Sequence, residues 1–209
     1  YFMKQFQQRS YVIAYHNADF PSCTAVDARP GLYFRTYRDL LLIGGGDHRT
    51  GQKGDGYAVI EDCVRRYFPQ AKEAFRWANQ DCVTLDSIPY IGPYSSAMPN
   101  VYVATGFNLW GMTTSMAAAD ILASQIQDKP HPYAAVFDPQ RRILHPQLFR
   151  NLGMTLGSFL FPTLRRCPHL GCALHYNKAE HSWDCACHGS RFTEDGALID
   201  NPAMKNAKI

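Results

Sequence analysis

The sequence predicts an α+β fold that ends in a small all-β module, and three observations indicate this class. Two apolar runs joined by a short turn, 31–37 and 40–43, are typical of a hairpin. Apolar residues at helical spacing follow over 57–68. Beyond residue 160 short strand-like runs alternate with loops rich in Gly, Cys and His. We therefore expect a mixed or antiparallel sheet with helices first and a strand-only module last.

Composition excludes several classes of protein. The chain has 209 residues, 46% of them hydrophobic, so a core can form and disorder is not expected. The net charge of +3 comes without a long basic run, so we expect no nucleic acid as a partner. The longest apolar stretch, 154–164, is interrupted by Gly157 and Pro162 and is too short to span a membrane. We expect a cytoplasmic protein with no membrane span.

The first two-thirds of the chain alternate strands and helices. We expect Gly44–Gly46 to end the second strand of the hairpin and Pro69 to stop the helix at 57–68. The remaining expected elements are an edge strand at 10–15, a strand at 75–85, a short buried strand at 101–104, and a helix at 112–127 that turns Met116, Ala119, Ile121, Leu122 and Ile126 toward the core.

The glycine-rich segment 44–56 does not have the pattern of a phosphate-binding loop. Gly46–Gly51 is followed by Gln52, whereas a P-loop requires Lys and then Ser or Thr. We expect this segment to be a break in regular structure that lets the backbone approach a neighbouring segment.

Cysteine and histidine occur in two pairs near the C-terminus. Cys167-Pro-His169 is followed, after fifteen residues, by Cys185-Ala-Cys187-His188. Two Cys and two His are the ligands of a Rieske [2Fe–2S] centre, in which each pair holds one iron. A structural zinc site uses the same residue types, usually with Cys-x2–4-Cys spacing, and is the alternative.

Both segments resemble the cluster-binding boxes of the Rieske family, in 167–172 and 183–192. The resemblance implies that Cys167 and Cys185 bind one iron and that His169 and His188 bind the solvent-facing iron. In high-potential members the positions of Cys172 and Cys187 form a disulfide between the two loops. A pair of buried free thiols is the alternative for these two residues.

Two further positions of the resemblance concern the redox potential. Ser190 stands where a hydroxyl donates to a bridging sulfide in high-potential members, and Phe192 stands where those members often have Tyr. Because one donor is kept and the other is missing, we expect a potential below the respiratory type and above plant-type ferredoxins.

Four segments, in order, resemble FAD-dependent oxidoreductases of the D-amino-acid-oxidase type: 31–35, 42–47, 86–92 and 101–112. In that family the last segment lies against the isoalloxazine ring. The resemblance implies FAD as cofactor, with four contacts in this turn: Gly106, Asn108, Gly111 and Met112. On the hairpin, Tyr33 and Arg35 are candidates to face the substrate, and His48 is a weaker candidate for a role.

Together the two resemblances point to fusions of a FAD-dependent oxidoreductase with a C-terminal Rieske domain. They imply a small amine or amino-acid-like substrate and a redox partner that accepts electrons. No dinucleotide fingerprint occurs here, so an N-terminal FAD-binding portion is expected outside these residues, and we do not expect these residues alone to be active.

We divide the sequence into a flavoprotein portion at 1–137, a helical linker at 138–160 and a Rieske domain at 161–209. The last is short for its family, and we expect it to lean on the flavoprotein portion. A stand-alone electron carrier with a docking domain and a zinc-stabilised interaction protein are the alternative functions.

Overall fold

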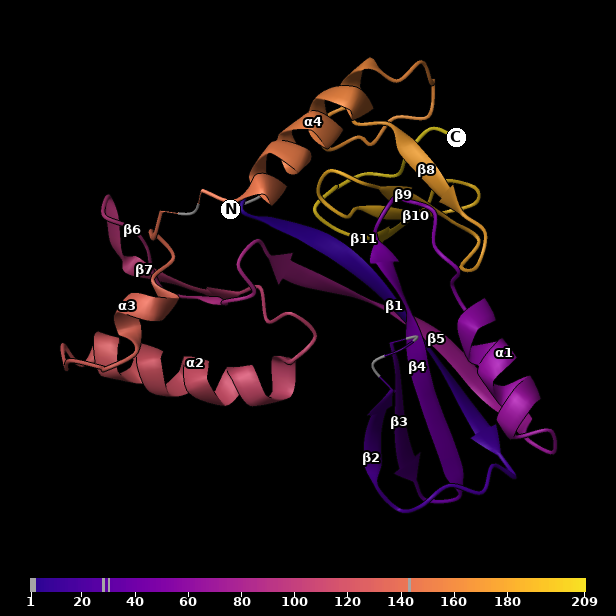
Figure 1. Cartoon of the computed structure of the whole chain (residues 1–209). Coiled ribbons are helices and arrows are strands. Elements are labelled where there is room, and N and C mark those ends of the chain that lie inside the picture. Colours follow the sequence, from indigo (N-terminus) through magenta and orange to yellow (C-terminus); the bar gives the residue numbers. More distant parts are fainter. Residues whose placement is uncertain (1–2, 28, 30, 143) are drawn as a thin grey trace. The chain divides into compact units, whose positions relative to one another are not determined.

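The computed structural model describes residues 3–27, 29, 31–142 and 144–209 (Figure 1). They form two compact units, each built from distant parts of the sequence. The first unit combines the start of the chain, up to Gln7, with Asp81–Gly157, and the second combines Gln8–Gln80 with Ser158–Ile209. Antiparallel sheets and helices confirm the predicted α+β class. The division at 137/138 and 160/161 concerns sequence modules and stays a prediction.

A five-stranded sheet is the largest element of the structure, with strand order β2-β3-β4-β1-β5. The predicted hairpin is confirmed, because β3 and β4 pair antiparallel from Tyr37 and Leu40 onward. The bounds of the strands are β1 (Gln5–His16), β2 (Thr24–Asp27), β3 (Leu32–Tyr37), β4 (Leu40–Arg49) and β5 (Lys72–Thr84).

The expected edge strand at 10–15 is wrong, because β1 lies between β4 and β5 inside the sheet. Every residue from Arg9 to Tyr15 is buried. Successive side chains of a strand point to opposite faces, so this run is covered on both faces of the sheet. Burial on both faces removes the alternation that would have distinguished an interior strand from an edge strand.

The expected end of the second strand at Gly44–Gly46 is also wrong. β4 continues through these glycines to Arg49, with Gly44 and Gly45 opposite Val12 and Tyr11. A β-carbon on Gly44 would lie 1.9 Å from the Tyr33 ring, so the glycine leaves room for this ring on the neighbouring strand. Backbone pairing needs no side chain, so glycines can continue a strand that is held on both sides.

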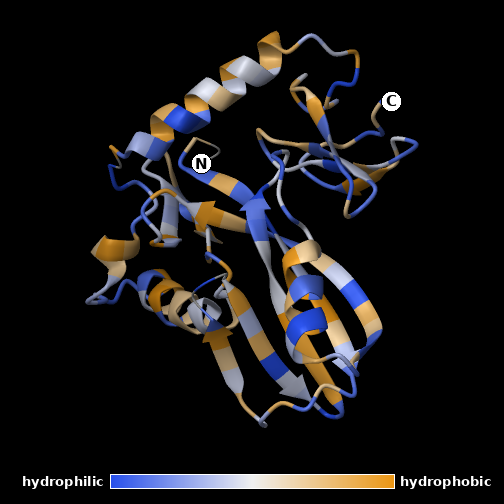
Figure 2. Cartoon of the chain, turned by 45° about the vertical axis from the view of Figure 1, so that its right-hand side comes forward, coloured by the Kyte–Doolittle hydropathy of each residue, from blue (hydrophilic) through white to orange (hydrophobic). Residues whose placement is uncertain are grey.

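The predicted helix at 57–68 is confirmed as α1 (Ala58–Tyr67). Its buried residues, Ile60 and Val64, are four positions apart on one face and pack against the sheet. Figure 2 shows hydrophobic and hydrophilic residues on different sides of this helix. Fully or almost fully buried members of the core around it include Tyr11, Ile13, Leu32, Leu41 and Ile43.

The first unit contains a two-stranded sheet, and the expectation of a buried strand at 101–104 is wrong. Val101 lies on β7, which pairs with β6 only, and its side chain is 47% exposed. The unit comprises β6 (Tyr90–Ser95), β7 (Met98–Thr105), α2 (Gly111–Ile126), α3 (Ala134–Phe137) and most of α4 (Pro146–Leu160).

The predicted helix at 112–127 is confirmed as α2, but its core face is narrower than predicted. Ile121 is buried and Leu122 packs beside it, together with Ala118, which the prediction missed. α2 packs on little more than β6 and α3, so the other three predicted core residues are exposed. These residues are Met116, Ala119 and Ile126. No described helix is long and apolar enough to cross a membrane.

The C-terminal module is a four-stranded antiparallel sheet of order β11-β10-β9-β8 (Figure 1). The short strand-like runs expected beyond residue 160 are confirmed as four strands. The chain turns between the paired residues Asn177 and Ser182, which end β8 and begin β9. The strands are β8 (Leu174–Asn177), β9 (Ser182–Cys185), β10 (Arg191–Thr193) and β11 (Leu198–Asp200).

The module packs against the five-stranded sheet within the second unit, as its short length had predicted. Glu180, in the turn between β8 and β9, lies 3.3 Å from the fully buried Arg9 guanidinium and accepts a 2.7 Å hydrogen bond from the Tyr57 hydroxyl. Asn177 donates to the Tyr11 hydroxyl at 3.0 Å. Burial, and then the Glu180 carboxylate, raise the pKa of Tyr57, so this hydroxyl stays a donor.

Replacing Glu180 with alanine should therefore destabilise the protein. Glu180→Ala leaves the buried Arg9 charge without its counter-ion, and breaking such a pair costs about 3–5 kcal/mol. The free energy of unfolding in urea measures the effect. The control is Lys178→Ala in the same turn, at an exposed residue, and it should change stability by less than about 0.5 kcal/mol. Equal losses in the two variants would contradict the role given to Glu180.

Candidate functional site

Two tight loops at one end of the β8–β9 hairpin carry the four predicted ligands. The first precedes β8 and is closed by two backbone bonds, from Cys167 N–H to the Cys172 carbonyl and from Gly171 N–H to the Cys167 carbonyl, both 2.8 Å. The second joins β9 to β10 and is closed by bonds from Cys185 N–H to Ser190 (2.9 Å) and from Gly189 N–H to Cys185 (3.0 Å). Leu174 pairs with Cys185 across the hairpin, which brings the loops together.

The four predicted ligand side chains meet in two like pairs. The Cys167 and Cys185 thiols are buried and hydrogen-bonded to each other. The imidazoles of His169 and His188 are nearly perpendicular, with ring centroids 5.0 Å apart, and are only partly buried. The arrangement thus sets two sulfurs in the interior and two imidazoles toward the surface, as the two-iron arrangement requires.

The donor atoms fit an iron–sulfur cluster. His169 Nδ1 is buried without a hydrogen-bond partner, which is costly unless a metal or another group satisfies it. The hydrogen bond from Cys185 lowers the pKa of Cys167 to about 6, and the same contact raises the pKa of Cys185. The lowered pKa favours the thiolate of Cys167, which is the form that binds metal.

Cys172 and Cys187 also lie beside the ligand loops. The sulfur atoms of Cys172, Cys185 and Cys187 are all within 4.8 Å of one another. In this structure Cys172 and Cys187 are free thiols, so the disulfide between them stays a prediction. These three thiols are close enough together to hold a metal ion, and they share only Cys185 with the predicted ligand set.

Ser190 and Phe192 are both fully buried. The Ser190 hydroxyl donates to the Cys167 sulfur and accepts a 2.9 Å bond from Ala203 N–H. Phe192 packs in the core that contains Cys167 and Cys185. A hydroxyl donor therefore lies at the cluster loops, as expected, and its contact with a bridging sulfide stays a prediction.

The glycine-rich segment after β4 comes close to the second ligand loop; the sequence predicted an approach to a neighbouring segment but not which segment. Gly51 has a left-handed φ of +74°, and a β-carbon there would lie 2.7 Å from Ala186 N and 2.8 Å from its Cα. Ala186 separates Cys185 from Cys187. Sequence reasoning missed two other residues near this loop, Thr50 just after β4 and Gln80 on β5, which no spacing pattern connects with the cysteines.

The predicted flavin turn lies in the first unit, where part of it is used for internal packing. A β-carbon on Gly106, whose φ is +74°, would lie 2.2 Å from Thr84 Cγ2. Asn108 N–H donates to the Cys82 carbonyl at 3.2 Å, and Asn108 Oδ1 accepts from Thr84 N–H at 2.8 Å. Asn108 thus fixes the turn to β5.

The other two predicted flavin contacts, Gly111 and Met112, open α2. The residue that caps this helix, Trp110, makes no side-chain hydrogen bond to it, and Met112 is 88% exposed. An uncapped helix start presents free N–H groups to a ligand. All four flavin contacts stay predictions.

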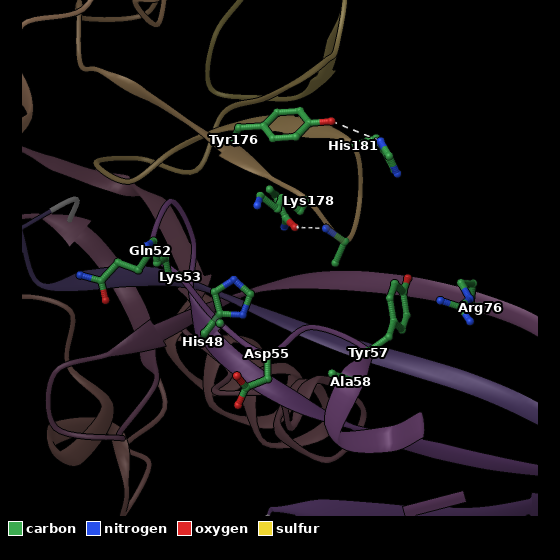
Figure 3. Close-up of a pocket in the computed structure, with 13 residues that line it drawn as sticks. His48, Gln52, Lys53, Asp55, Tyr57, Ala58, Arg76, Tyr176, Lys178 and His181 are labelled. Atoms are coloured by element: carbon green, nitrogen blue, oxygen red, sulfur yellow. Dashed lines mark hydrogen bonds between the residues drawn. The ribbon is translucent and has the colours of Figure 1, made fainter. Parts of the chain in front are cut away.

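The hairpin candidates differ in their surroundings. Arg35 is exposed and Tyr33 is half-buried over Gly44. His48 stacks on Tyr11, with ring centroids 5.6 Å apart, and lines a polar cavity of about 680 Å³ within the second unit (Figure 3). Lys53 and Lys178 also line this cavity, and the cluster ligands do not. His48 thus lines a cavity to which the predicted cluster ligands do not contribute.

Comparison with known proteins gives two domains. A family model described as FAD dependent oxidoreductase matches residues 3–125, and one described as Rieske [2Fe-2S] domain matches residues 158–209. The first implies FAD and the second a [2Fe-2S] cluster.

Relatives match these parts. The Rieske 2Fe-2S iron-sulfur protein YhfW of Bacillus subtilis is 30% identical over 260 aligned residues, which cover 100% of this chain and 51% of that protein. The chain thus spans about half the length of this relative. The cytochrome b6-f complex iron-sulfur subunit 3 of Nostoc sp. is 42% identical over 43 residues, which cover 21% of this chain and 24% of that protein.

Solved structures are similar in fold. Glycine oxidase from Geobacillus kaustophilus gives a TM-score of 0.58 at 21% identity, over 68% of this chain and 40% of that one. Iminodiacetate oxidase from Chelativorans sp. BNC1 gives 0.51 at 14% identity, over 65% and 40%. At these identities the likeness concerns the fold alone.

Gly51→Ala should disturb the second ligand loop. The new β-carbon would overlap the backbone of Ala186, and the left-handed backbone adds about 1–2 kcal/mol for a residue other than glycine. We expect less iron per protein and a changed visible spectrum. The matched control is Gly157→Ala in α4, where no atom lies within 4 Å and stability should rise by roughly 0.5–1 kcal/mol. Full iron content and an unchanged spectrum in Gly51→Ala would contradict the contact.

Proposed function

Because the chain belongs to the FAD dependent oxidoreductase family and carries a Rieske [2Fe-2S] domain, we propose that it serves in an oxidoreductase that combines flavin oxidation with one-electron transfer. The observation that carries this proposal is the meeting of two thiols and two imidazoles from separate loops. FAD supplies hydride acceptance when bound, and a [2Fe–2S] cluster supplies single-electron transfer.

We assign the ligand roles by the positions of the side chains. Cys167 and Cys185 hold the inner iron through thiolates, and His169 and His188 hold the outer iron through imidazole nitrogens. The burial of the sulfurs and the partial exposure of the rings support this assignment. In the proposed oxidised, loaded protein Cys172 and Cys187 join the two loops through a disulfide.

The flavin side of the proposal rests on the turn at 106–112. Gly106 and Asn108 fix this turn on β5, and Gly111 and Met112 start a helix whose N–H groups are free to face a ligand. We propose that a dinucleotide-binding portion outside these 209 residues completes the FAD site. The chain spans 51% of the length of YhfW, so the relative has room for such a portion.

The proposed substrate is a small amine or an amino-acid-like compound, and the proposed partner is a redox protein or another acceptor of single electrons. The fold shared with glycine oxidase and iminodiacetate oxidase, whose names denote small amino-acid substrates, supports the substrate class.

The main test uses the holoprotein, loaded with flavin and iron, under anaerobic conditions. A panel of small amino acids and amines is added, and the visible spectrum follows flavin and cluster separately. We expect one of these compounds to bleach both sets of bands. In Cys185→Ser the cluster bands should be lost while the substrate still bleaches the flavin, because Cys185 binds the cluster and does not contact the flavin.

Cys23→Ser, at an exposed free cysteine of the same chain, is the control and should behave as the unchanged protein. A flavin that is reduced by substrate in the unchanged protein while the cluster stays oxidised would refute the electron-transfer scheme. A colourless protein that binds zinc would refute the cluster itself.

The potential of the cluster gives a second test. It should lie between that of plant-type ferredoxins, about −400 mV, and the upper Rieske limit of about +300 mV. Phe192→Tyr adds a hydroxyl in the core beside the ligand cysteines and should raise the potential, since a donor to sulfur stabilises the reduced cluster. Redox titration measures the potentials of the unchanged protein and of the Phe192→Tyr variant. Tyr176→Phe, at an exposed residue of the β8–β9 hairpin, is the control. A value near +300 mV in the unchanged protein would contradict the expectation.

A further inference from the structure

A glutamine of the five-stranded sheet is bonded to the loop that carries Cys185 and His188. Gln80, near the end of β5, donates a 2.8 Å hydrogen bond from Nε2 to the carbonyl of Gly189. Gly189 follows His188 directly, and its own N–H donates to the Cys185 carbonyl at 3.0 Å. The residue that Gln80 binds, Gly189, is therefore next to His188 in sequence and is itself hydrogen-bonded to Cys185.

The orientation of this amide is set by a second residue. The Thr50 hydroxyl, which is 1% exposed, donates to Gln80 Oε1 at 2.9 Å. Because a hydroxyl donor selects the oxygen end of an amide, the NH₂ end is turned to the Gly189 carbonyl. Thr50 precedes Gly51, which packs on Ala186, so two neighbouring residues after β4 support the same ligand loop.

We propose that Gln80 is a positioning residue for the cluster: its amide, oriented by Thr50, fixes the loop of Cys185 and His188 on β5. A hydrogen bond to this carbonyl also polarises the peptide groups next to the ligands, so it influences the potential of the cluster. The proposal rests on the ligand roles of Cys185 and His188 given above.

The experiment replaces Gln80 by methionine, which has a similar length and no donor. Holoprotein is reduced with dithionite, and its electron paramagnetic resonance spectrum and midpoint potential are recorded. We expect the cluster to be retained, with changed g values. At a fixed potential the ratio of reduced to oxidised cluster should change at least threefold, about 28 mV for a one-electron couple. The control is Asn79→Ala at the exposed neighbouring residue, which should leave both readouts unchanged.

Thr50→Val supplies a second, nearly isosteric variant. It should shift the same readouts in the same direction as Gln80→Met, and the double variant should shift them no further than Gln80→Met alone, because both changes remove one interaction. If Gln80→Met fails to retain the cluster, Thr50→Val decides the question.

An unchanged spectrum and potential in both single variants, or additive shifts in the double variant, would overturn the proposal. Failure of the proposed function can be distinguished from failure of this proposal, because in the first case the unchanged protein itself would lack the Rieske spectrum.

Discussion

A single carboxylate, Glu180, lies between two buried guanidinium groups, and the placement of the C-terminal module on the sheet depends on it. It is 3.3 Å from Arg9 on β1 and 3.5 Å from Arg191 on β10. Arg191 is further paired with Asp184 at 3.3 Å and Asp200 at 3.0 Å. A sheet of four short strands cannot bury enough apolar surface to be stable alone. Buried pairs to a neighbouring sheet fix its position, because moving either partner leaves an uncompensated charge.

This attachment determines where the ligand loops lie. Both loops emerge from one end of the β8–β9 hairpin, while Glu180 holds the turn at its other end. Gly51, just after β4, and Gln80 of β5 contact the second ligand loop, so the hairpin is supported at both ends. Such support suits a centre that exchanges electrons, since ligands held by an outer set of hydrogen bonds keep their geometry when the charge changes.

The sequence by itself determined the chemistry of the site. The spacing of Cys167, His169, Cys185 and His188 is a local property of two short loops, so it identified the Rieske domain without knowledge of the fold. Helix α1 and the β3–β4 hairpin were also predictable, because each follows from neighbouring residues. Tertiary structure alone decided that β1 is an interior strand, that β4 continues through its glycines and that Met116 is exposed. It also brought Gln80 to Gly189, 109 positions apart. These features depend on which segments pair and cover each other, and residues so far apart in sequence leave no local pattern that records the contact.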